Sequence, residues 1–354
     1  MADAIALLQE RVRAAGAAKT PLAIRAGGTK DFYGNAVKGE PLDPRAHAGI
    51  VAHEPTELVI TARCGTPLAE LEAALDEKGQ MLAFEPPHFG AAATVGGCVA
   101  AGLSGPRRAS VGSARDFVLG VKLIDGRGDL LRFGGTVMKN VAGYDVSRLL
   151  AGSLGTLGVI VEASLKVLPK PPAEATLRFE LDEATAIRRM NEWAGQPLPI
   201  SATAWSSGAL AVRLSGARAA VDAARTKLGG ERVDDAQAQS FWRGIREHTD
   251  PFFVVNAPLW RLGVPSTAEP LAAAGEQMIE WGGAQRWLRT SLPAHEVRKR
   301  AQSLGGHATL FRGGDRSVGV FAALAPAVAA IHKRLKAEFD PAGIFNPGRM
   351  YSDF

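Results

Sequence analysis

Three glycine-rich segments in the first half of the chain, at residues 24–34, 85–112 and 138–171, constrain its fold more than any other feature. In the first of them, IRAGGTKDFYG, Gly27 and Gly28 directly follow a short apolar stretch that is typical of a strand. Glycine adopts positive φ without strain, so consecutive backbone N–H groups of such a turn can converge on an anion. Because an ordinary surface turn has the same composition, this segment alone does not decide between a binding loop and a structural turn.

The second segment, EPPHFGAAATVGGCVAAGLSGPRRASVG, predicts a helix that begins after Thr94 as its cap. Gly96 and Gly97 fall in the first turn of this helix. Each glycine in a helix costs about 1 kcal/mol relative to alanine, and the close approach of a ligand would explain that cost. Tight helix packing through the small residues that continue up to Gly105 would explain it equally, and both interpretations stay open.

The third segment places Gly143, Gly152, Gly155 and Gly158 around a short helix and before a strand. Three such backbone surfaces in one domain favour a long cofactor that carries a pyrophosphate. The fingerprint G-x-G-x-x-G follows none of the expected strands, which disfavours a nicotinamide site of the Rossmann type.

The composition is that of a folded globular protein with two domains, since the 354 residues are 46% hydrophobic and 22% charged. The net charge of +5 is spread along the chain without basic runs interleaved with aromatics, which disfavours a nucleic-acid partner. Cys64 and Cys98 match no metal spacing, so we expect two buried, reduced cysteines and no metal site. No apolar run is long enough to span a membrane, and we expect a cytoplasmic protein.

Helix and strand signals alternate along the chain. The expected elements of the first half are a helix at 1–16, strands at 22–25, 49–53 and 58–63, a helix at 66–79 capped by Thr66, a hairpin over 117–135 and a strand over 157–172. This last strand runs into a proline cluster, which is the expected domain boundary. The elements expected beyond it are strands at 175–181, 200–206 and 209–214, helices at 183–194 and 216–229, a similar order up to 321, and a last helix at 327–339. This order predicts an antiparallel sheet with helices on one face.

The order of these segments resembles flavoproteins of the vanillyl-alcohol oxidase type, and within them the FAD-binding subunits of multi-subunit glycolate oxidases. The resemblance rests on RAGGTKD, ATVGG with GLSG, DFVLGVKLIDGRGDLLRFGG, KNVAGYDVSRLLAGSLGTLGVI and DPAGIFNPGRM. It implies an α+β fold with three parts. These are a PCMH-type FAD-binding domain of two α/β subdomains at 1–172, an antiparallel-sheet cap domain with helices on one face at 173–325, and a C-terminal helix and tail at 326–354 that return to the FAD domain.

The resemblance also assigns residues to FAD. The implied contacts are Gly27, Gly28, Thr29, Lys30 and Asp31 in the first segment, Thr94, Gly96, Gly97, Ser104 and Gly105 in the second, and Gly155, Gly158 and Val159 in the third. Members of the family that bind flavin covalently often use a histidine in or near the first loop. Residues 25–34 contain no histidine, so we expect non-covalent FAD, and we interpret His88 near the second loop as structural.

Acid–base groups for oxidising a 2-hydroxy acid are few in this chain. The flavin would take hydride from the α-carbon, a base would take the hydroxyl proton, and a cation would hold the carboxylate. Larger relatives carry a histidine-rich segment for this work, whereas this chain has only GGHATLFRGGD, with His307 and Arg312 as candidates. A strand residue is an equal interpretation of His307. Further candidates near the flavin are Arg349 in NPGRM and, more weakly, Lys139 and Tyr144.

The resemblance therefore predicts an FAD-dependent oxidoreductase that oxidises glycolate to glyoxylate as one subunit of a complex. Two cysteines cannot hold a cluster, so electrons would leave to an iron–sulfur subunit and then to membrane quinones. A larger FAD-linked glycolate oxidase subunit is the other expected partner, and the complex would lie at the inner face of the cytoplasmic membrane. Two alternatives stay open, namely a stand-alone FAD-dependent 2-hydroxy acid dehydrogenase and a non-catalytic assembly subunit.

Overall fold

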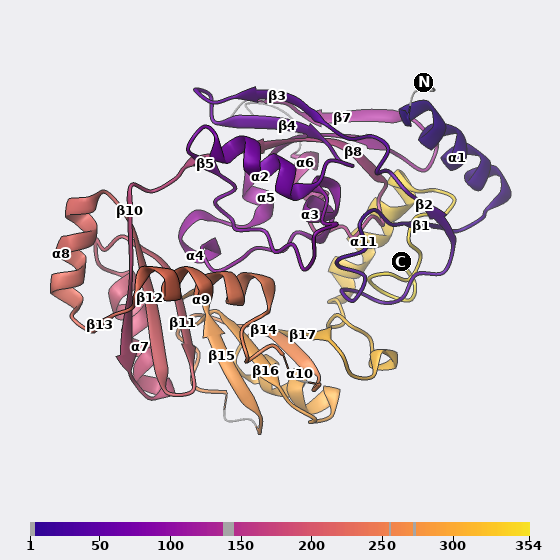
Figure 1. Cartoon of the computed structure of the whole chain (residues 1–354). Helices are drawn as coiled ribbons and strands as arrows, with labels where there is room; N and C mark the ends of the chain where they lie inside the picture. The colour runs from indigo at the N-terminus through magenta and orange to yellow at the C-terminus, as the bar shows by residue number, and fades with distance from the viewer. Residues whose placement is uncertain (1–3, 137–144, 255, 272–273) are drawn as a thin grey trace. The chain divides into compact units, whose positions relative to one another are not determined.

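The structure, a computed structural model, describes residues 4–136, 145–254, 256–271 and 274–354, and it divides the chain into two compact units (Figure 1). Unit 1 comprises Met1–Leu103, Ser113–Pro169 and Ala323–Phe354, and unit 2 comprises Ser104–Gly112 and Lys170–Ala322. The division at Pro169 lies inside the proline cluster. The short segment 104–112 belongs to unit 2, although the sequence places it within the first domain.

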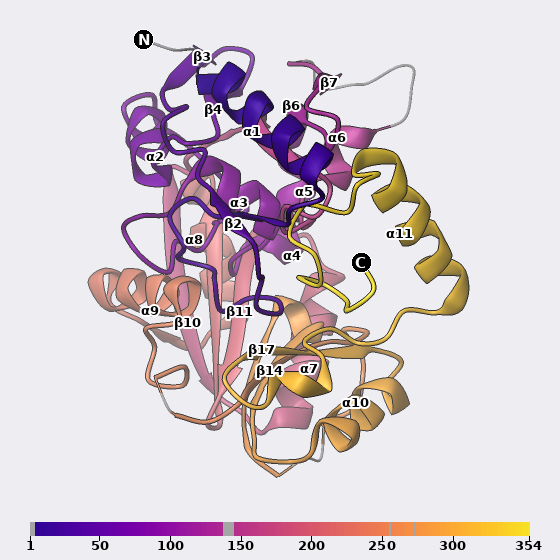
Figure 2. The ribbon, with the colours of Figure 1, turned by 90° about the vertical axis from the view of Figure 1, so that its right-hand side faces the viewer.

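Unit 1 joins the two ends of the chain in one core. It begins with helix α1 (Ala4–Ala18) and the parallel strands β1 (Leu22–Ile24) and β2 (Glu40–Leu42). Helix α1 buries Leu8 and Val12, which share a core with Leu22 and Phe345. Figure 2 shows the tail that follows helix α11 (Pro326–Phe339). Phe345 belongs to this tail and pairs with Leu22 in a parallel bridge. The C-terminal tail is therefore part of the same core as α1 and β1.

A five-stranded antiparallel sheet in the order β3-β4-β8-β6-β7 forms the rest of unit 1. Its strands are β3 (Ile50–Glu54), β4 (Val59–Arg63), β6 (Val118–Ile124), β7 (Leu130–Gly134) and β8 (Val159–Lys166). The accompanying elements are α2 (Leu68–Asp76), α3 (Val95–Ala101), α5 (Ala114–Phe117), α6 (Val146–Leu149) and the strand pair β5 (Gln80–Met81) and β9 (Leu168–Pro169). The expected hairpin is confirmed as β6 and β7, and the Asp125 carboxylate closes its turn by accepting the backbone N–H groups of Arg127 and Asp129.

The expected cap of helix α2 at Thr66 is wrong, because the N-cap residue is Pro67 and no side chain caps this helix. The Thr66 hydroxyl donates to the carbonyl of Arg63 at 2.7 Å and accepts the N–H of Gly49 at 2.8 Å. Gly49 lies 17 residues away in the sequence. A hydroxyl that holds a neighbouring loop is no longer available to the first turn of its own helix.

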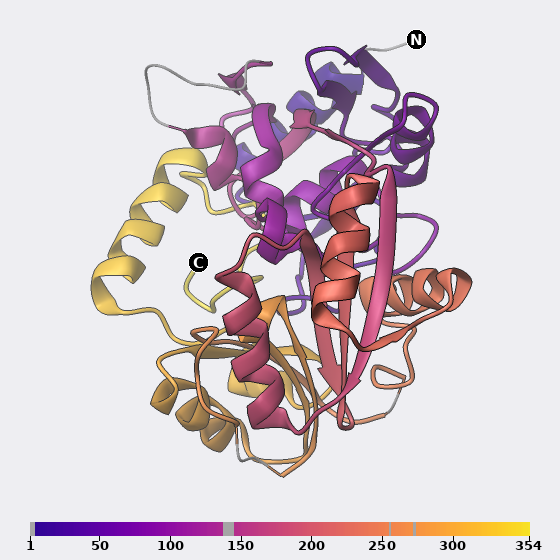
Figure 3. The same ribbon diagram turned by 90° about the vertical axis from the view of Figure 1, so that its left-hand side faces the viewer.

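Unit 2 is built on an eight-stranded antiparallel sheet in the order β13-β10-β12-β11-β15-β16-β14-β17. Its strands are β10 (Ala173–Glu180), β11 (Ile200–Ser206), β12 (Ala209–Gly216), β13 (Glu231–Arg232), β14 (Leu259–Gly263), β15 (Glu276–Glu280), β16 (Gln285–Arg289) and β17 (His307–Arg312). The helices of one face are α7 (Glu183–Ala194), α8 (Arg218–Leu228) and α10 (Ala294–Ser303). Figure 3 shows α7 and α8, in rose and salmon, along this face.

Helix α9 (Asp235–Glu247) contacts the opposite face of the same sheet. The indole Nε1 of Trp242 donates to the hydroxyl of Thr176 at 2.9 Å. Side chains alternate along a strand, and the neighbours Ala175 and Leu177 pack in the core of α7 and α8, so Thr176 points the other way. The helices expected on one face are therefore accompanied by α9 on the other face.

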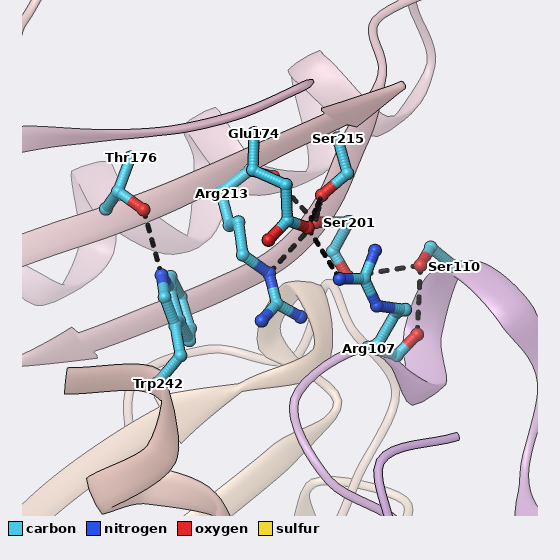
Figure 4. Close-up of polar contacts among 8 residues, drawn as sticks. All are labelled: Arg107, Ser110, Glu174, Thr176, Ser201, Arg213, Ser215 and Trp242. Atoms are coloured by element: carbon cyan, nitrogen blue, oxygen red, sulfur yellow. Dashed lines mark hydrogen bonds and ion pairs between the residues drawn. The ribbon is translucent and has the colours of Figure 1, made fainter. Parts of the chain in front are cut away.

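Segment 104–112, which contains helix α4 (Arg108–Val111), is tethered to the sheet of unit 2 by polar side chains (Figure 4). The guanidinium of Arg107 donates to the Glu174 carboxylate at 2.7 Å, and the Ser110 hydroxyl donates to the carbonyl of Ser201 at 3.1 Å. The Ser201 hydroxyl accepts from Arg213 Nε at 3.0 Å. A charge-assisted hydrogen bond of this kind is roughly twice as strong as a neutral one, so Arg107 is the main tether.

Candidate functional site

Unit 1 contains a cavity of about 380 Å³ among the first glycine-rich segment, helix α3 and the C-terminal tail. Its walls are residues 23–31, Val37, Thr94, Gly97, Ala100, Ala101, Leu154, Asn346 and Arg349. The structure therefore brings the whole predicted first loop together with Thr94 and Gly97 from the second segment. Segments that are far apart in the sequence meet at one polar surface.

The first loop offers a run of backbone donors to this cavity. Within the described part of the chain, the N–H groups of Ala26, Gly27, Gly28 and Thr29 have no hydrogen-bond acceptor. All four residues line the cavity and are partly accessible. Successive backbone N–H groups of this kind make an anion-binding concavity, and they lose no side-chain entropy when they bind.

Both glycines of this loop are required by its geometry. Gly28 has φ of +68°, in the left-handed region that a side chain disfavours. A Cβ atom at Gly27 would lie 1.6 Å from the carbonyl oxygen of Ala92, so any side chain there would displace the neighbouring loop. The turn is therefore close-packed and lined with donors, and its role as a flavin-binding loop stays a prediction.

The charged residues that line the cavity are three cations, Arg25, Lys30 and Arg349, and one carboxylate, Asp31. The Asp31 carboxylate would oppose an anion, but it accepts from Arg25 Nε at 2.6 Å. Lys30 donates to the carbonyl of His88 at 3.3 Å, and the Arg349 guanidinium donates to the carbonyl of Asn35 at 2.7 Å and to that of Lys30 at 3.2 Å. Asp31 is thus paired with Arg25, and Lys30 and Arg349 place two further cations in the cavity wall.

Helix α3 contributes a wall rather than free donors. Thr94 caps it as expected by accepting the N–H of Gly97 at 3.1 Å. The N–H groups of Val95 and Gly96 donate to the carbonyls of Thr66 and Cys64. A Cβ atom at Gly96 would lie 2.7 Å from that of Cys64, so tight packing explains this glycine, which does not line the cavity. Gly97 and Thr94 do line it.

Asn346 is a site residue that the sequence analysis missed. This buried side chain accepts the N–H of Ile24 at 2.7 Å and donates to the carbonyl of Leu154 at 2.7 Å. It thereby connects the strand before the first loop to the third glycine-rich segment, and it lines the cavity. The signal was available, because Asn-Pro-Gly is a turn sequence, but only Arg349 was selected from that segment.

A buried ion pair holds the tail that carries Asn346. The Lys336 ammonium contacts the Asp340 carboxylate at 2.8 Å and donates to the carbonyls of Thr156 and Phe345, each at 2.7 Å. Asp340 in turn accepts the N–H groups of Ile344 and Phe345. Desolvation lowers the pKa of Lys336, while the hydrogen bond and the charge of Asp340 oppose that shift.

The remaining predicted flavin contacts are not among the residues that line this cavity. Gly155 and Gly158 have positive φ. A Cβ atom at Gly155 would lie 2.7 Å from Asn346 Nδ2, and one at Gly158 would lie 2.7 Å from the Ile124 carbonyl oxygen. Val159 is buried in the core that α1 shares with β1. Ser104 and Gly105 belong to unit 2, where the Gly105 carbonyl accepts from Trp281 Nε1 at 3.1 Å. Gly143, Lys139 and Tyr144 lie outside the described residues. Flavin contacts by these five described residues, like those by the residues that line the cavity, stay predictions.

The acid–base candidates His307 and Arg312 both belong to unit 2. His307 begins β17 opposite Gly263, where desolvation and the nearby charge of Arg261 lower its pKa. Desolvation also lowers the pKa of Arg312. The sequence analysis did not select His248, which stacks on Phe253 with ring centroids 3.9 Å apart. Burial lowers the pKa of His248 well below its usual value, and the charges of Arg312 and Arg261 lower it further.

The predicted structural role of His88 agrees with its contacts, since His88 Nε2 lies 3.0 Å from a Glu72 carboxylate oxygen. Cys64 and Cys98 are free and buried, as expected. Across the residues that the structure describes, no group of three potential metal ligands comes together, and no helix is both long and apolar enough to cross a bilayer. The donor-rich loop and the cations that line the same cavity fit the pyrophosphate of an FAD.

Comparisons with known proteins agree with that fit. Residues 2–134 match a family described as FAD binding domain. The chain is 51% identical over 346 residues to "Glycolate oxidase subunit GlcE" of Escherichia coli (strain K12), covering 98% of this chain and 97% of that one. It is 37% identical over 120 residues to "Glycolate oxidase subunit GlcD" of Bacillus subtilis (strain 168), covering 34% of this chain and 25% of that one.

A solved structure shows the fold. The crystal structure of p-cresol methylhydroxylase with substrate bound superposes with a TM-score of 0.72, at 16% identity, over 99% of this chain and 87% of that one. The chain thus has the α+β fold of PCMH-type FAD-binding proteins, in which an antiparallel-sheet domain accompanies the FAD domain.

Proposed function

The chain belongs to the family of the glycolate oxidase subunit GlcE, a family of FAD-binding oxidoreductases, and on this premise we propose that it is the FAD-binding subunit of a complex that oxidises glycolate to glyoxylate. The observation that carries the proposal is the run of backbone N–H groups at residues 26–29 beside Lys30 and Arg349. This arrangement suits the two phosphates of FAD, because its donors need no side chain and its cations balance the charge.

FAD, when bound, supplies an acceptor for the hydride on the α-carbon of a 2-hydroxy acid. The role of this chain is to bind and orient the cofactor. The N–H groups of residues 26–29 donate to phosphate oxygens, Lys30 and Arg349 offset the phosphate charge, and Asn346 holds the loop in place. Because no histidine lies among residues 25–34, the FAD is held without a covalent bond.

The non-covalent link is testable by precipitating the purified protein with acid. We expect free FAD to appear in the supernatant, where its absorption spectrum identifies it. Flavin that stays in the washed precipitate would demonstrate covalent attachment and contradict this part of the proposal.

Electrons leave this chain for a partner. Its only cysteines, Cys64 and Cys98, are buried, and burial raises the pKa of Cys98 to about 12, so neither offers a ready thiolate ligand for a cluster. The proposed partners are an iron–sulfur subunit that receives the electrons and a larger FAD-linked subunit of the GlcD kind. Through them the chain would reach the quinone pool at the inner face of the cytoplasmic membrane.

Purification of the chain alone and together with the two partner subunits tests the proposal. We expect the chain alone to bind FAD without reducing a dye in the presence of glycolate, and the assembled complex to do both. Glycolate oxidation by the chain alone would instead show a stand-alone 2-hydroxy acid dehydrogenase, with neutral His307 as the candidate base. A chain without FAD that still restores activity to its partners would show a non-catalytic assembly subunit.

A further inference from the structure

Unit 2 contains a second cavity, of about 670 Å³, for which the proposed function has no use. It lies on the face of the sheet where α10 packs against β14 and β17. Trp260 and Leu310, both almost fully buried, form its apolar part. The volume is within the range of about 300–1,000 Å³ that is typical of sites for small molecules.

Trp260 carries a polar group that the protein leaves unsatisfied. Its side chain is 2% exposed, and its indole Nε1 has no hydrogen-bond partner. The indole N–H is a donor only, and a buried donor without an acceptor costs free energy that a phenylalanine ring would not incur. Arg298 stacks over this indole with its guanidinium carbon 5.6 Å from the ring centroid, and Arg298 Nε is likewise buried without a partner.

The other polar groups around this cavity also favour an acceptor-bearing ligand. Lys299 lines the cavity, and so do the first residues of α10, whose N-terminus has no side-chain cap. The one carboxylate among the lining residues, that of Asp315, is occupied, because it accepts the N–H and the hydroxyl of Ser317 at 2.9 and 2.7 Å. The cavity therefore combines unsatisfied donors and positive charge with an apolar floor.

We propose that this cavity binds a small organic carboxylate with an apolar body. The carboxylate would accept from the Trp260 indole N–H and from Arg298 Nε and would face the charge of Lys299, while the apolar body would cover Trp260 and Leu310. A fully hydrated inorganic anion would gain nothing from that floor. The site shares no lining residue with the cavity of unit 1, so the proposal does not depend on the assignment of FAD to that cavity.

The test uses the holoprotein labelled with 5-fluorotryptophan and titrated with phenylacetate, with inorganic phosphate as the second probe. The resonance of Trp260, identified by its absence in Trp260→Phe, is expected to shift on titration, and calorimetry gives the dissociation constant. We expect phenylacetate to bind at least about tenfold more tightly than phosphate. The FAD absorption spectrum, recorded throughout, is expected to stay unchanged.

Two variants and a control locate the binding. Trp260→Phe keeps the ring but removes the donor, and Lys299→Gln removes a charge from an exposed position, so each should weaken phenylacetate binding by about fivefold to tenfold. Lys227→Gln, a change at an exposed lysine on α8, should leave it unchanged.

Three results would overturn the proposal. One is an unmoved Trp260 resonance at about 20 mM phenylacetate, which would correspond to negligible affinity. Another is binding that neither Lys299→Gln nor Trp260→Phe weakens. The third is phosphate binding as tight as that of phenylacetate, which would show a plain anion site at the helix end. Should Trp260→Phe fail to fold, calorimetric titration of Lys299→Gln and of the control Lys227→Gln with phenylacetate still decides.

Discussion

In unit 1 the run of donors at the first loop of the candidate flavin cavity belongs to the backbone, whereas unit 2 buries the side chains of several arginines. Residues 26–29 present N–H groups through two glycines. Unit 2 instead buries arginines, such as Arg107 against Glu174 and the fully buried Arg286 against the carbonyl of Glu269 at 2.7 Å. Backbone donors are ordered by the fold itself, whereas each buried guanidinium must recover its desolvation cost from partners. Adding a side chain therefore damages the loop of backbone donors, whereas removing a partner group damages the contacts of a buried arginine.

The largest expected effect concerns Gly28→Val, which tests the role of the backbone donors in unit 1. A β-branched side chain at φ of +68° is strained and would meet the Arg25 guanidinium, so we expect FAD affinity to fall by about a thousandfold or more. Equilibrium dialysis with FAD measures it. Gly79→Val is the matched control, because Gly79 has φ of +62° in open space outside the cavity and should lose stability but keep FAD. Equal losses of FAD in both variants would show that the first loop is only a structural turn.

The next effect concerns Asp340→Asn, which removes the negative partner of a buried pair in unit 1. It leaves the Lys336 ammonium buried without its counter-charge, which typically costs about 3–5 kcal/mol of unfolding free energy. Urea denaturation measures the loss. Asp353→Asn, which breaks the exposed pair with Lys333, should change stability very little. Similar small losses in both variants would mean that the tail, unlike the arginine clusters of unit 2, is held by its backbone and apolar contacts alone.

A smaller effect follows from the buried His248 of unit 2. Its pKa is well below 6.5 in the folded chain, so below pH 6.5 the unfolded chain binds a proton that the folded chain does not. Stability is then lost as pH falls, by up to about 1.4 kcal/mol per pH unit. In His248→Asn, which tolerates the φ of +54° at this position, urea denaturation at pH 7.5, 6.5 and 5.5 should show a shallower loss. An unchanged slope would exclude this histidine as the acid-sensitive group.

The smallest effect is expected for His307→Ala in the assembled complex. His307 lies at the exposed start of β17, and if this chain works as a partner-dependent subunit, its loss should lower glycolate oxidation only a few-fold. Loss of a general base would cost about 10²–10⁴-fold. Steady-state rates, normalised to FAD content, measure the change. A drop of about a thousandfold with full FAD content would make His307 the base and would move the chemistry into unit 2.

Much of the fold could be predicted from local patterns in the sequence. Helix α7 has the bounds that the sequence predicts, and the β6–β7 hairpin forms around its glycine-bearing turn. Both depend on neighbours in sequence, namely helical spacing behind the Asp182 cap and turn residues between alternating strands. Thr94 and Thr66 carried the same capping signal, yet only Thr94 caps its helix, because the Thr66 hydroxyl holds a loop 17 residues away.

What the sequence by itself determined, through the order of its glycine-rich segments and their resemblance to flavoproteins, is the type of site, since glycine-rich turns can present backbone N–H groups to an anion. The tertiary structure alone decided which residues complete it. Asn346 lies 322 residues from Ile24 and 192 from Leu154, and no spacing rule joins such partners. It also decided that Gly96 packs against Cys64 and that Trp260 is left with an unsatisfied donor. The physical reason is that propensity and turn chemistry act over a few residues, whereas hydrogen-bond satisfaction and close packing depend on every segment that folding brings together.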